Sequence, residues 1–497
     1  MHLVARTVPR SGGAADHTRS LGGYYIKGAA HTIKMADLLL THGYFLWEDE
    51  KERQIMKPYP TLGLLYNSAY LRRAGFAVEI FDTTFRSKAD LVARLAQTPG
   101  GVLGIYTNLI TRGNVVWTIG EAKRQGWTVI CGGPEAANYT REYIAQGADV
   151  VVIGEGEATL AELLPALAQR GPHRLHGIPG VVFRNEEGAL IRNAEREQIA
   201  DIDSLPWPDR EQINLSQYVD VWRTHHGMGS VNLITARGCP YKCKWCSHAV
   251  FGYSHRRRSY LDCAAEVQHI VDVYQPDQVW YADDVFTINH RWLFEYAAEL
   301  KRRGLRLPFE TISRADRMMK DDVLATLADM GCYRIWIGSE SGSQRILDAM
   351  QRGVTVEQVQ WATHAAQRHG IEVGMFLMWG YDGEQIEDIE ATIEHVKKAN
   401  PNIFFTTVAY PIKNTPYYET IKDTLHLDRD WVEATDRDYV VRGRHTRQYY
   451  RFADQWLRNE VAAHRVNGQD AGEALRLQTL AQDARRSLLA VADEQEG

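Results

Sequence analysis

The sequence predicts an α/β protein with a Rossmann-like, doubly wound parallel sheet, followed by a partial (β/α)6 TIM-type barrel and a C-terminal helical segment. Short apolar runs alternate with amphipathic stretches in two successive series, the pattern of parallel strands joined by helices. Glycines gather just after the strand ends of the first series, where open α/β sheets bind ligands. These two observations set the fold class.

The first series falls within residues 34–170. A helix is expected over 62–74, because Gly75 follows its last periodic residue. A second helix is expected over 87–97, where Ser87 and the acidic residue three positions later have the spacing of a capping box. The five expected strands are 36–40, 77–81, 102–106, 128–131 and 150–153.

Residues 171–230 are expected to form a linker. They contain a hairpin over 181–193 that turns near Gly188. Pro206 and Pro208 follow, and two prolines this close exclude a continuing helix or a central strand.

The second series occupies residues 231–418, and its strands are separated by expected helices such as 291–303 and 356–369. Six βα units predict a barrel or partial barrel whose function lies at the carboxyl ends of the strands. Residues 419–497 are helical in pattern, and residues 1–33 form an N-terminal extension. The six expected strands are 231–235, 278–282, 309–312, 333–337, 372–378 and 404–409.

The composition is that of an ordinary globular protein, with 44% hydrophobic and 24% charged residues. A net charge of −6 gives no basic excess that would favour nucleic acid as a partner. No apolar run approaches the roughly 20 residues that span a bilayer. No secretory signal is apparent, and clustered cysteines are typical of metal-binding proteins in the cytoplasm, which is the expected compartment.

Three of the six cysteines carry the strongest chemical signal. Cys239, Cys243 and Cys246 form a CxxxCxxC motif directly after the first strand of the second series. A closed zinc site needs four ligands, and His248 is the one nearby candidate for the fourth. A cubane iron–sulfur cluster also takes four thiolates, so three would leave one iron free to bind a ligand. The zinc interpretation stays open as the minor alternative.

A CxxxCxxC motif at this position resembles the signature of the radical S-adenosylmethionine superfamily. The resemblance implies that the three cysteines hold a [4Fe–4S] cluster. It also implies that the open iron binds S-adenosylmethionine, which is split by one electron into methionine and a 5′-deoxyadenosyl radical.

Further strand ends resemble the family's positions for S-adenosylmethionine. By this resemblance, the methionine, ribose and adenine parts would be bound by Trp245, Asp283, Asp284, Ser313, Arg314, Glu340, Phe376 and Met378. Each residue type also has an ordinary structural role. Trp245 could be core packing, Asp284 a helix cap and Arg314 a surface ion pair. The basic run 256–258 is interpreted mainly as solvated or structural, with phosphate contact as the minor alternative.

The first series carries neither GxGxxG nor GxxxxGK[ST], which argues against a dinucleotide or nucleoside triphosphate. Its loops resemble the cobalamin-binding domain that precedes many radical S-adenosylmethionine barrels. The branch includes the anaerobic magnesium-protoporphyrin monomethyl ester cyclase and hopanoid methylases. The positions that match cobalamin-binding loops are Leu62, Gly63, Thr107, Asn108, Gly132, Gly133, Glu135, Gly154, Glu155 and Gly156.

One motif of that domain is missing. The DxHxxG sequence, whose histidine ligates cobalt in cobalamin mutases, does not occur. His42 follows the first strand without the required spacing. We therefore expect His42 to be a polar loop residue, and we expect no histidine ligand on the lower face of cobalt.

The resemblance implies methylation of an unactivated carbon by way of methylcobalamin. Non-methylating radical cyclisation or rearrangement is the alternative, and a non-catalytic, metal-stabilised cobalamin carrier is the alternative from another class. The expected partners are a small-molecule substrate and an electron donor such as flavodoxin or ferredoxin. Aromatic residues of the C-terminal segment are either helix core or a substrate pocket, with core favoured: Trp431, Tyr439, Tyr449, Tyr450 and Trp456.

Overall fold

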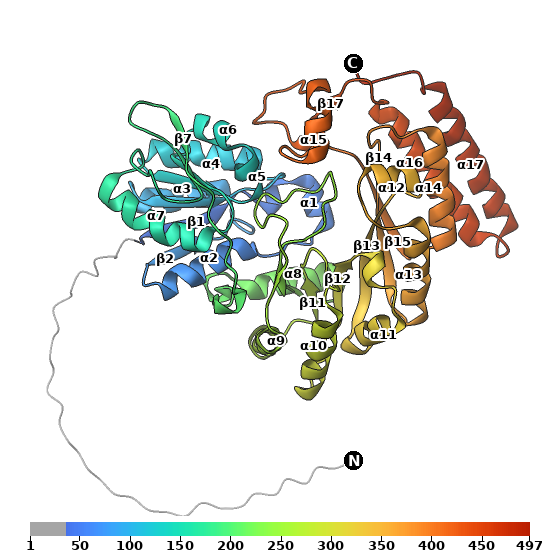
Figure 1. Ribbon diagram of the computed structural model, residues 1–497, viewed down its shortest axis with the longest axis horizontal. Coiled ribbons are helices and arrows are strands. Elements are labelled where there is room, and N and C mark those ends of the chain that lie inside the picture. Colours follow the sequence, from blue (N-terminus) through green and yellow to red (C-terminus); the bar gives the residue numbers. More distant parts are fainter. Residues whose placement is uncertain (1–35) are drawn as a thin grey trace, which may run out of the picture. The chain divides into compact units, whose positions relative to one another are not determined.

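The computed structural model describes residues 36–497, so the expected N-terminal extension over 1–33 lies outside the described residues. Two sheets organise the described chain (Figure 1). The first has seven strands and the second has six, and most neighbouring strands run parallel. The prediction of an α/β fold with parallel sheets is confirmed.

The first sheet has the strand order β2-β1-β3-β4-β5-β6-β7. Its parallel part follows the order 2-1-3-4-5, which is common in doubly wound sheets and reverses direction beside β1. Ligands of such sheets bind beyond the carboxyl ends of the strands at that reversal. The parallel strands are β1 Leu38–His42, β2 Val78–Phe81, β3 Val102–Tyr106, β4 Thr128–Gly132 and β5 Val150–Val152.

Both faces of the first sheet are buried. Neighbouring residues of one strand enter different apolar clusters, as Cys131 and Ile130 of β4 show. Ser87 caps α3 with the predicted capping box, its side chain accepting from the backbone N–H of Asp90. The helices of this part are α1 Glu50–Ile55, α2 Leu62–Arg73, α3 Lys88–Gln97, α4 Arg112–Arg124, α5 Pro134–Asn138, α6 Thr140–Ala145 and α7 Gly156–Arg170.

The predicted hairpin is present as β6, Val181–Arg184, and β7, Leu190–Arg192. We expected it inside the linker, but β6 pairs antiparallel with β5 and so extends the first sheet. Both strands of the hairpin therefore belong structurally to the first sheet. The rest of the segment holds one helix, α8 Leu215–His226.

The second sheet is fully parallel, in the order β15-β14-β13-β12-β11-β8. Each predicted strand of the second series corresponds to one of these strands, with ends shifted by up to three residues. The strands are β8 Ser230–Leu233, β11 Gln278–Tyr281, β12 Phe309–Ser313, β13 Cys332–Glu340, β14 Glu372–Trp379 and β15 Ile403–Val408.

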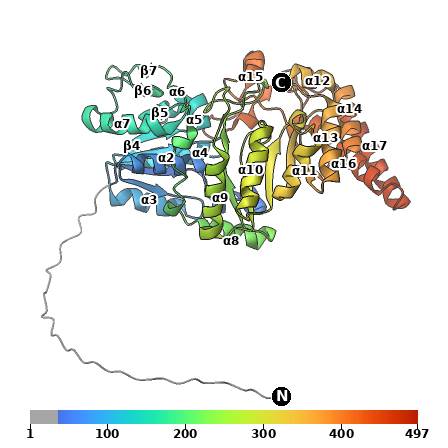
Figure 2. The same cartoon turned by 60° about the horizontal axis from the view of Figure 1, so that its bottom comes forward.

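Helices cover one face of the second sheet. Ile335, Ile337, Met375 and Leu377 point to that face and are at most 1% exposed. Figure 2 shows α9, α10, α11 and α13 side by side along it. The helices of this part are α9 Tyr260–Tyr274, α10 His290–Arg302, α11 Asp321–Met330, α12 Gln344–Ala349, α13 Val356–Arg368 and α14 Ile386–Ala399.

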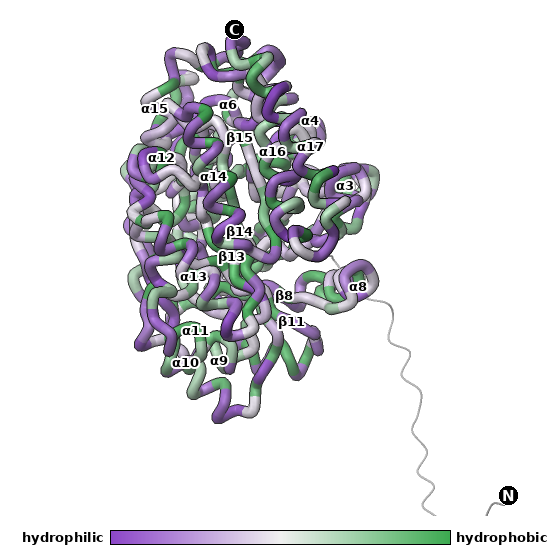
Figure 3. The backbone as a smooth tube through the Cα atoms, turned by 90° about the vertical axis from the view of Figure 1, so that its right-hand side faces the viewer, coloured by the Kyte–Doolittle hydropathy of each residue, from purple (hydrophilic) through white to green (hydrophobic). Residues whose placement is uncertain are grey.

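The chain ends in α15 Pro416–Ile421, α16 Arg447–Val466 and α17 Ala471–Ala490. Tyr449, Tyr450 and Trp456 of α16 are buried in the core of the second sheet, so the core interpretation holds for these three aromatics. The tube in Figure 3 is predominantly hydrophobic along β13 and β14 and more hydrophilic along the outer helices. Among residues 36–497, no helix has both the length and the apolar character needed to cross a membrane.

The remaining elements are short. Two further two-stranded pairs are β9 Ala236–Arg237 with β10 Arg256–Arg257, and β16 Leu425–His426 with β17 Val440–Val441. The 3-10 turns are Leu46–Glu48, Ile202–Ser204, Arg210–Gln212, Ala315–Arg317, Lys422–Thr424 and Asp436–Asp438.

Candidate functional site

The cysteine motif lies in a loop that the β9–β10 pair closes at its base. Gly238 begins the loop with a φ of +83°, and a Cβ there would lie 2.4 Å from the Ser254 carbonyl oxygen. Any side chain at this position would clash, which explains the glycine before the first cysteine. The backbone of Lys244 ties the loop to the segments after β13 and β15, donating to Met350 and accepting from Tyr417.

Cys243 is the buried member of the motif and lies between two guanidinium groups. Nη1 of Arg314 and Nη1 of Arg352 each lie 3.9 Å from its Sγ. The Arg314 guanidinium also stacks 3.6 Å from the centre of the Tyr241 ring, within the same loop. Two buried positive charges beside one sulfur would stabilise a negatively charged metal cluster bound there.

The three thiols are suited to a metal centre, although the fold alone does not gather them. Desolvation raises the pKa of Cys239, and raises the pKa of Cys246 to about 12, so these two thiols are protonated in the metal-free chain. Within residues 36–497 no three Cys, His, Asp or Glu side chains converge around one point. Neutral thiols have no attraction that would bring them together, and metal binding supplies it while releasing their protons. A donor set of three thiols in one loop fits a [4Fe–4S] cluster with one open iron.

The two aspartates after β11 differ in their surroundings. Asp283 is buried, and it accepts hydrogen bonds from the backbone N–H and the hydroxyl of Thr235 at 2.6 and 2.5 Å. Arg257 lies 3.3 Å from the same carboxylate. Asp284 is exposed to a cavity instead, and desolvation together with Asp283 raises its pKa to about 6. Of the two predicted residues, Asp284 is the one with oxygens free for a ligand.

Glu340, at the end of β13, has the features of a strained functional residue. Its φ is +62°, in the left-handed region that non-glycine residues rarely occupy. Its side chain is buried, and burial raises its pKa to about 7 while Arg352, 3.9 Å away, lowers it. No described residue donates a hydrogen bond to this carboxylate, so a ligand hydroxyl could do so.

The other predicted S-adenosylmethionine residues are distributed around the same end of the sheet. Ser313 is buried and bonded to Thr287, and Arg314 donates to Asp316 and to two backbone carbonyls as well as facing Cys243. Trp245 and Met378 meet in one apolar cluster. Their roles in binding S-adenosylmethionine stay predictions.

The glycine-rich loops of the first sheet line a cavity of about 520 Å³. Residues of the second sheet also reach it, including Asn232, Ile234, Arg237 and Asp284. The cavity therefore touches both sheets. Eight of the ten predicted cobalamin positions line it: Leu62, Gly63, Asn108, Gly132, Gly133, Gly154, Glu155 and Gly156.

The other two predicted positions do not reach the cavity. Thr107 is fully buried; its hydroxyl donates to the Gly132 carbonyl and accepts from the Ala136 N–H. Glu135 is buried in an ion pair with Arg112. The structure thus gives Thr107 and Glu135 the role of fixing the loops, because their polar atoms are already satisfied within the protein.

Sequence reasoning missed Arg237, two residues before Cys239. Its Nη1 and Nη2 lie 2.6 Å from carboxylate oxygens of Glu155 and Glu157, and all three side chains are at most 5% exposed. Arg256 adds a second pair to Glu155 at 2.7 Å. The cysteine loop and the loop after β5 are therefore joined by buried ion pairs. The acidic motif at 154–157 and an arginine before the first cysteine were visible in the sequence, but their pairing was not.

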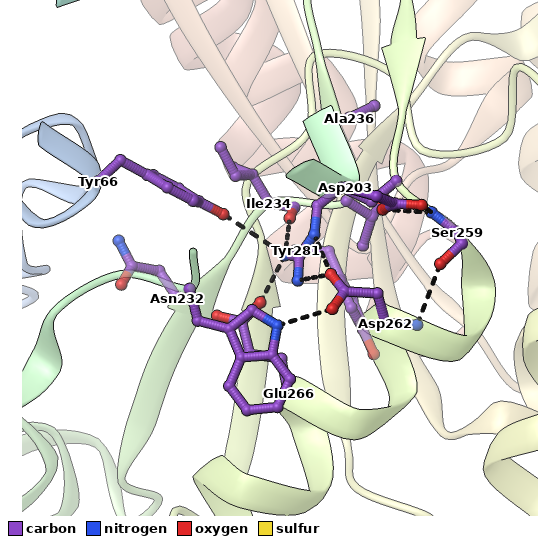
Figure 4. A network of polar contacts seen from close by, with 12 residues as sticks. Tyr66, Asp203, Asn232, Ile234, Ala236, Ser259, Asp262, Glu266 and Tyr281 are labelled. Carbon is purple, nitrogen blue, oxygen red and sulfur yellow. Dashed lines mark hydrogen bonds and ion pairs between the residues drawn. The ribbon is translucent and has the colours of Figure 1, made fainter. Parts of the chain in front are cut away.

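The basic run is structural rather than solvated. Arg258 donates to Asp262 and lies 2.5 Å from the buried Glu266, and its Nη1 contacts the hydroxyl of Tyr66 at 3.4 Å. Figure 4 shows Tyr66 approaching this network from one side and Asp262 from the other. The run thus contributes to joining α2 to the second sheet.

A segment near the C-terminus is tied to the first sheet. Arg112 Nη2 lies 3.0 Å from Asp436, and Trp431 packs against Tyr139 at 5.5 Å.

His42, at the end of β1, contacts Asp82 through Nε2 and Thr83 through Nδ1. Both nitrogens of His42 have protein partners, as expected for a polar structural residue.

Two family models match the chain. The B12 binding domain matches residues 54–164, and the radical SAM superfamily matches residues 233–396. The matched ranges contain the loops that line the cavity and the three cysteines, respectively.

The chain is similar to several known proteins. It is 28% identical to an uncharacterized methyltransferase of Pyrococcus horikoshii, over 78% of this chain and 84% of that protein. It is 22% identical to the anaerobic magnesium-protoporphyrin IX monomethyl ester cyclase of Rubrivivax gelatinosus, over 75% and 68%. It is 26% identical to the hopanoid C-3 methylase of Methylococcus capsulatus, over 76% and 70%.

Among solved structures, the fold is similar to that of TsrM from Kitasatospora setae, a radical S-adenosylmethionine methyltransferase with cobalamin and a [4Fe–4S] cluster bound. The TM-score is 0.65 at 18% identity, covering 81% of this chain and 78% of TsrM. At this identity the likeness establishes the fold.

Proposed function

Because this chain belongs to the cobalamin-dependent radical S-adenosylmethionine enzymes, we propose that it methylates an unactivated carbon atom of a small-molecule substrate. One observation carries the proposal. The cavity lined by the glycine loops of the first sheet is also lined by Asp284, which follows β11 on the side of the cysteine loop. A methyl donor and a hydrogen-abstracting group can then act on one substrate carbon within contact distance.

The residues that would hold the cofactors follow from the geometry described above. Cys239, Cys243 and Cys246 would hold the cluster, and the glycine loops that line the cavity would hold cobalamin. When bound, the cluster supplies the electron that cleaves S-adenosylmethionine, and cobalamin carries the methyl group.

The proposed reaction balances with two molecules of S-adenosylmethionine and two electrons for each methylation. One molecule gives up its methyl group and becomes S-adenosylhomocysteine. The other is split into methionine and a 5′-deoxyadenosyl radical, which takes a hydrogen atom from the substrate. The substrate loses a C–H bond and gains a C–CH3 bond. A low-potential electron donor such as flavodoxin or ferredoxin would supply the electrons, consistent with a cytoplasmic enzyme.

The chain's own residues position the reactants. Glu340 is suited to accept hydrogen bonds from the ribose hydroxyls, since no described residue donates to it. Asp284 is suited to the amino group, because its carboxylate faces the cavity. Arg314 would act through Cys243 and not through S-adenosylmethionine, because all three of its nitrogen atoms contact protein atoms. We also propose that the second sheet forms a partial barrel and the first a Rossmann-like domain.

Oxidative cyclisation or rearrangement is the second candidate, because one relative is a cyclase. The two reactions differ in their products. Methylation yields S-adenosylhomocysteine, whereas a non-methylating radical reaction consumes S-adenosylmethionine without producing it.

The test needs no substrate. The full chain is reconstituted anaerobically with iron, sulfide and cobalamin, reduced with titanium(III) citrate and given S-adenosylmethionine. We expect S-adenosylhomocysteine in an amount close to that of the bound cobalamin, together with slow formation of 5′-deoxyadenosine. Cys243→Ala should abolish 5′-deoxyadenosine.

Each other outcome contradicts the proposal in a different way. 5′-Deoxyadenosine without S-adenosylhomocysteine would favour cyclisation or rearrangement. Bound zinc with no cleavage of S-adenosylmethionine would favour a non-catalytic carrier.

A further inference from the structure

Three aromatic rings form a ladder across neighbouring strands of the second sheet. They are Trp336 on β13, Phe376 on β14 and Phe405 on β15. The ring centres of Trp336 lie 5.1 Å from Phe376 and 5.5 Å from Phe405, with planes inclined by only 17° and 13°. The three rings therefore present nearly parallel faces.

The register of the strands brings these rings together, and a glycine makes room for the indole ring. Phe376 and Phe405 are register partners on adjacent strands. Gly374 is the register partner of Trp336, and a Cβ on Gly374 would lie 2.3 Å from the indole ring. The indole Nε1 donates to Glu310 at 2.7 Å, which fixes the orientation of the ring. The ladder is thus a preorganised surface.

The ladder lies on the face of the sheet opposite the helices, where the described residues bury Trp336 but leave the two phenylalanines exposed. Phe376 is 36% exposed and Phe405 is 50% exposed, whereas Met375 and Leu377, their neighbours on the helix-covered face, are at most 1% exposed. Aromatic carbon that stays exposed to water forgoes the stabilisation that burial would give it. A contiguous apolar patch of this kind usually marks a binding site.

The ladder continues directly into the candidate active site. Phe376 is the register partner of Gly338, and a Cβ on Gly338 would lie 2.5 Å from Oε1 of Glu340. The Glu340 carboxylate therefore lies over the position next to Phe376. An occupant of the ladder would be adjacent to S-adenosylmethionine bound at Glu340, so a small molecule undergoing reaction fits this surface better than a protein partner.

We propose that Phe376 and Phe405, packed against the buried Trp336, bind the substrate through a planar, aromatic or conjugated ring system. Phe376 is thereby assigned to the substrate instead of to S-adenosylmethionine. This inference rests on the proposed function, because it assigns the ladder to the substrate of that same site. A flat ring can extend the parallel stack, and each aromatic contact strengthens binding about three- to tenfold beyond the effect of burying area. An aliphatic substrate of equal size would bind without this gain from aromatic stacking.

The test measures binding, not turnover. Benzyl alcohol and its saturated counterpart cyclohexylmethanol serve as flat and non-planar probes of similar size. They are titrated into the full chain reconstituted with cluster and cobalamin, and binding is followed by ligand-observed NMR. We expect benzyl alcohol to bind more tightly than cyclohexylmethanol. Phe405→Leu keeps apolar volume but removes a ring, so it should weaken benzyl alcohol by about three- to tenfold and leave cyclohexylmethanol nearly unchanged. Phe294→Leu, which makes the same change at a ring 37% exposed on α10, is the matched control and should change the affinity for neither probe.

Three outcomes would overturn the proposal. Equal affinities of the wild type and Phe405→Leu for benzyl alcohol would exclude stacking on the ladder. If Phe405→Leu weakened the binding of S-adenosylmethionine as much as that of benzyl alcohol, the ladder would be assigned to the adenine ring. A dimer that dissociates in Phe405→Leu, seen by sedimentation, would assign it to a second copy of the chain. Absence of S-adenosylhomocysteine formation would contradict the proposed methylation and leave these binding results intact.

Discussion

The carboxyl ends of the two sheets are built from different chemistry. After β4 and β5 of the first sheet, the loops are rich in glycine and line a cavity of about 520 Å³. After β8, β12 and β13 of the second sheet, the loops carry thiols, guanidinium groups and the strained, buried Glu340. Backbone without side chains leaves volume for a bulky planar ligand, whereas converging charged side chains suit a compact metal cluster and a small polar cofactor. The two ends meet at Arg237, which pairs with Glu155 and Glu157 across the boundary.

The largest effect is expected from removing one cysteine side chain of the loop after β8. Cys243→Ala should abolish the iron–sulfur cluster. It leaves only two of the three thiolates in the motif, and two thiolates do not hold a four-iron cluster. Iron and sulfide analysis after anaerobic reconstitution would measure this. Cys263→Ala removes a buried cysteine of the sheet core and should keep the iron content of the wild type. Retention of iron by Cys243→Ala would show that the motif is not the ligand set.

The second largest effect is expected from breaking the buried ion pairs of Arg237, which join the cysteine loop to the loop after β5. Arg237→Gln leaves Glu157 buried without its partner, which should cost about 3–5 kcal/mol of unfolding free energy. Denaturation of the cofactor-free chain would measure the loss. Arg174→Gln breaks a solvent-exposed pair with Glu186 and should change the unfolding free energy little, because water screens exposed ion pairs. Similar losses in the two variants would show that the buried pairs do not hold the two loops together.

The third prediction concerns pH. The pKa of Glu340 is raised to about 7 in the folded chain, from an ordinary value near 4.5. The folded state therefore binds the proton more tightly, and ionised Glu340 destabilises the fold increasingly as pH rises from about 4.5 to 7. Glu340→Gln should stabilise the cofactor-free chain at pH 8 by on the order of 3 kcal/mol and have no effect near pH 4. A stability difference between the two chains that does not change with pH would contradict this.

The smallest effect is expected from adding a side chain to a glycine that lines the cavity of the first sheet. A Cβ at Gly63 would have 3.7 Å to the Tyr106 ring, so a larger side chain is tolerated and enters the cavity. Gly63→Leu should therefore weaken cobalamin binding about tenfold, or about 1.4 kcal/mol, without lowering the melting temperature. Gly120→Leu, on α4 away from the cavity, is the matched control and should leave cobalamin binding unchanged. Unchanged affinity in Gly63→Leu would mean that cobalamin does not occupy this cavity.

The sequence by itself determined the strands, the helices and the cysteine motif, because these depend on local patterns. Alternating apolar residues and caps act over a few positions, as at Ser87, and CxxxCxxC is contained in one loop. Four of the cavity-lining glycines could be recognised for the same reason, since Gly132, Gly133, Gly154 and Gly156 lie at the ends of their own strands.

Only the tertiary structure decided which side chains meet. The pairing of Arg237 with Glu157 joins residues 80 positions apart, and the ladder of Trp336, Phe376 and Phe405 depends on the register of three strands. It also separated Asp284, which faces the cavity, from the buried Asp283 next to it. Local patterns place a residue on a strand, but burial and charge pairing depend on segments that are distant in sequence. These long-range contacts decide which predicted residues have atoms free for a ligand.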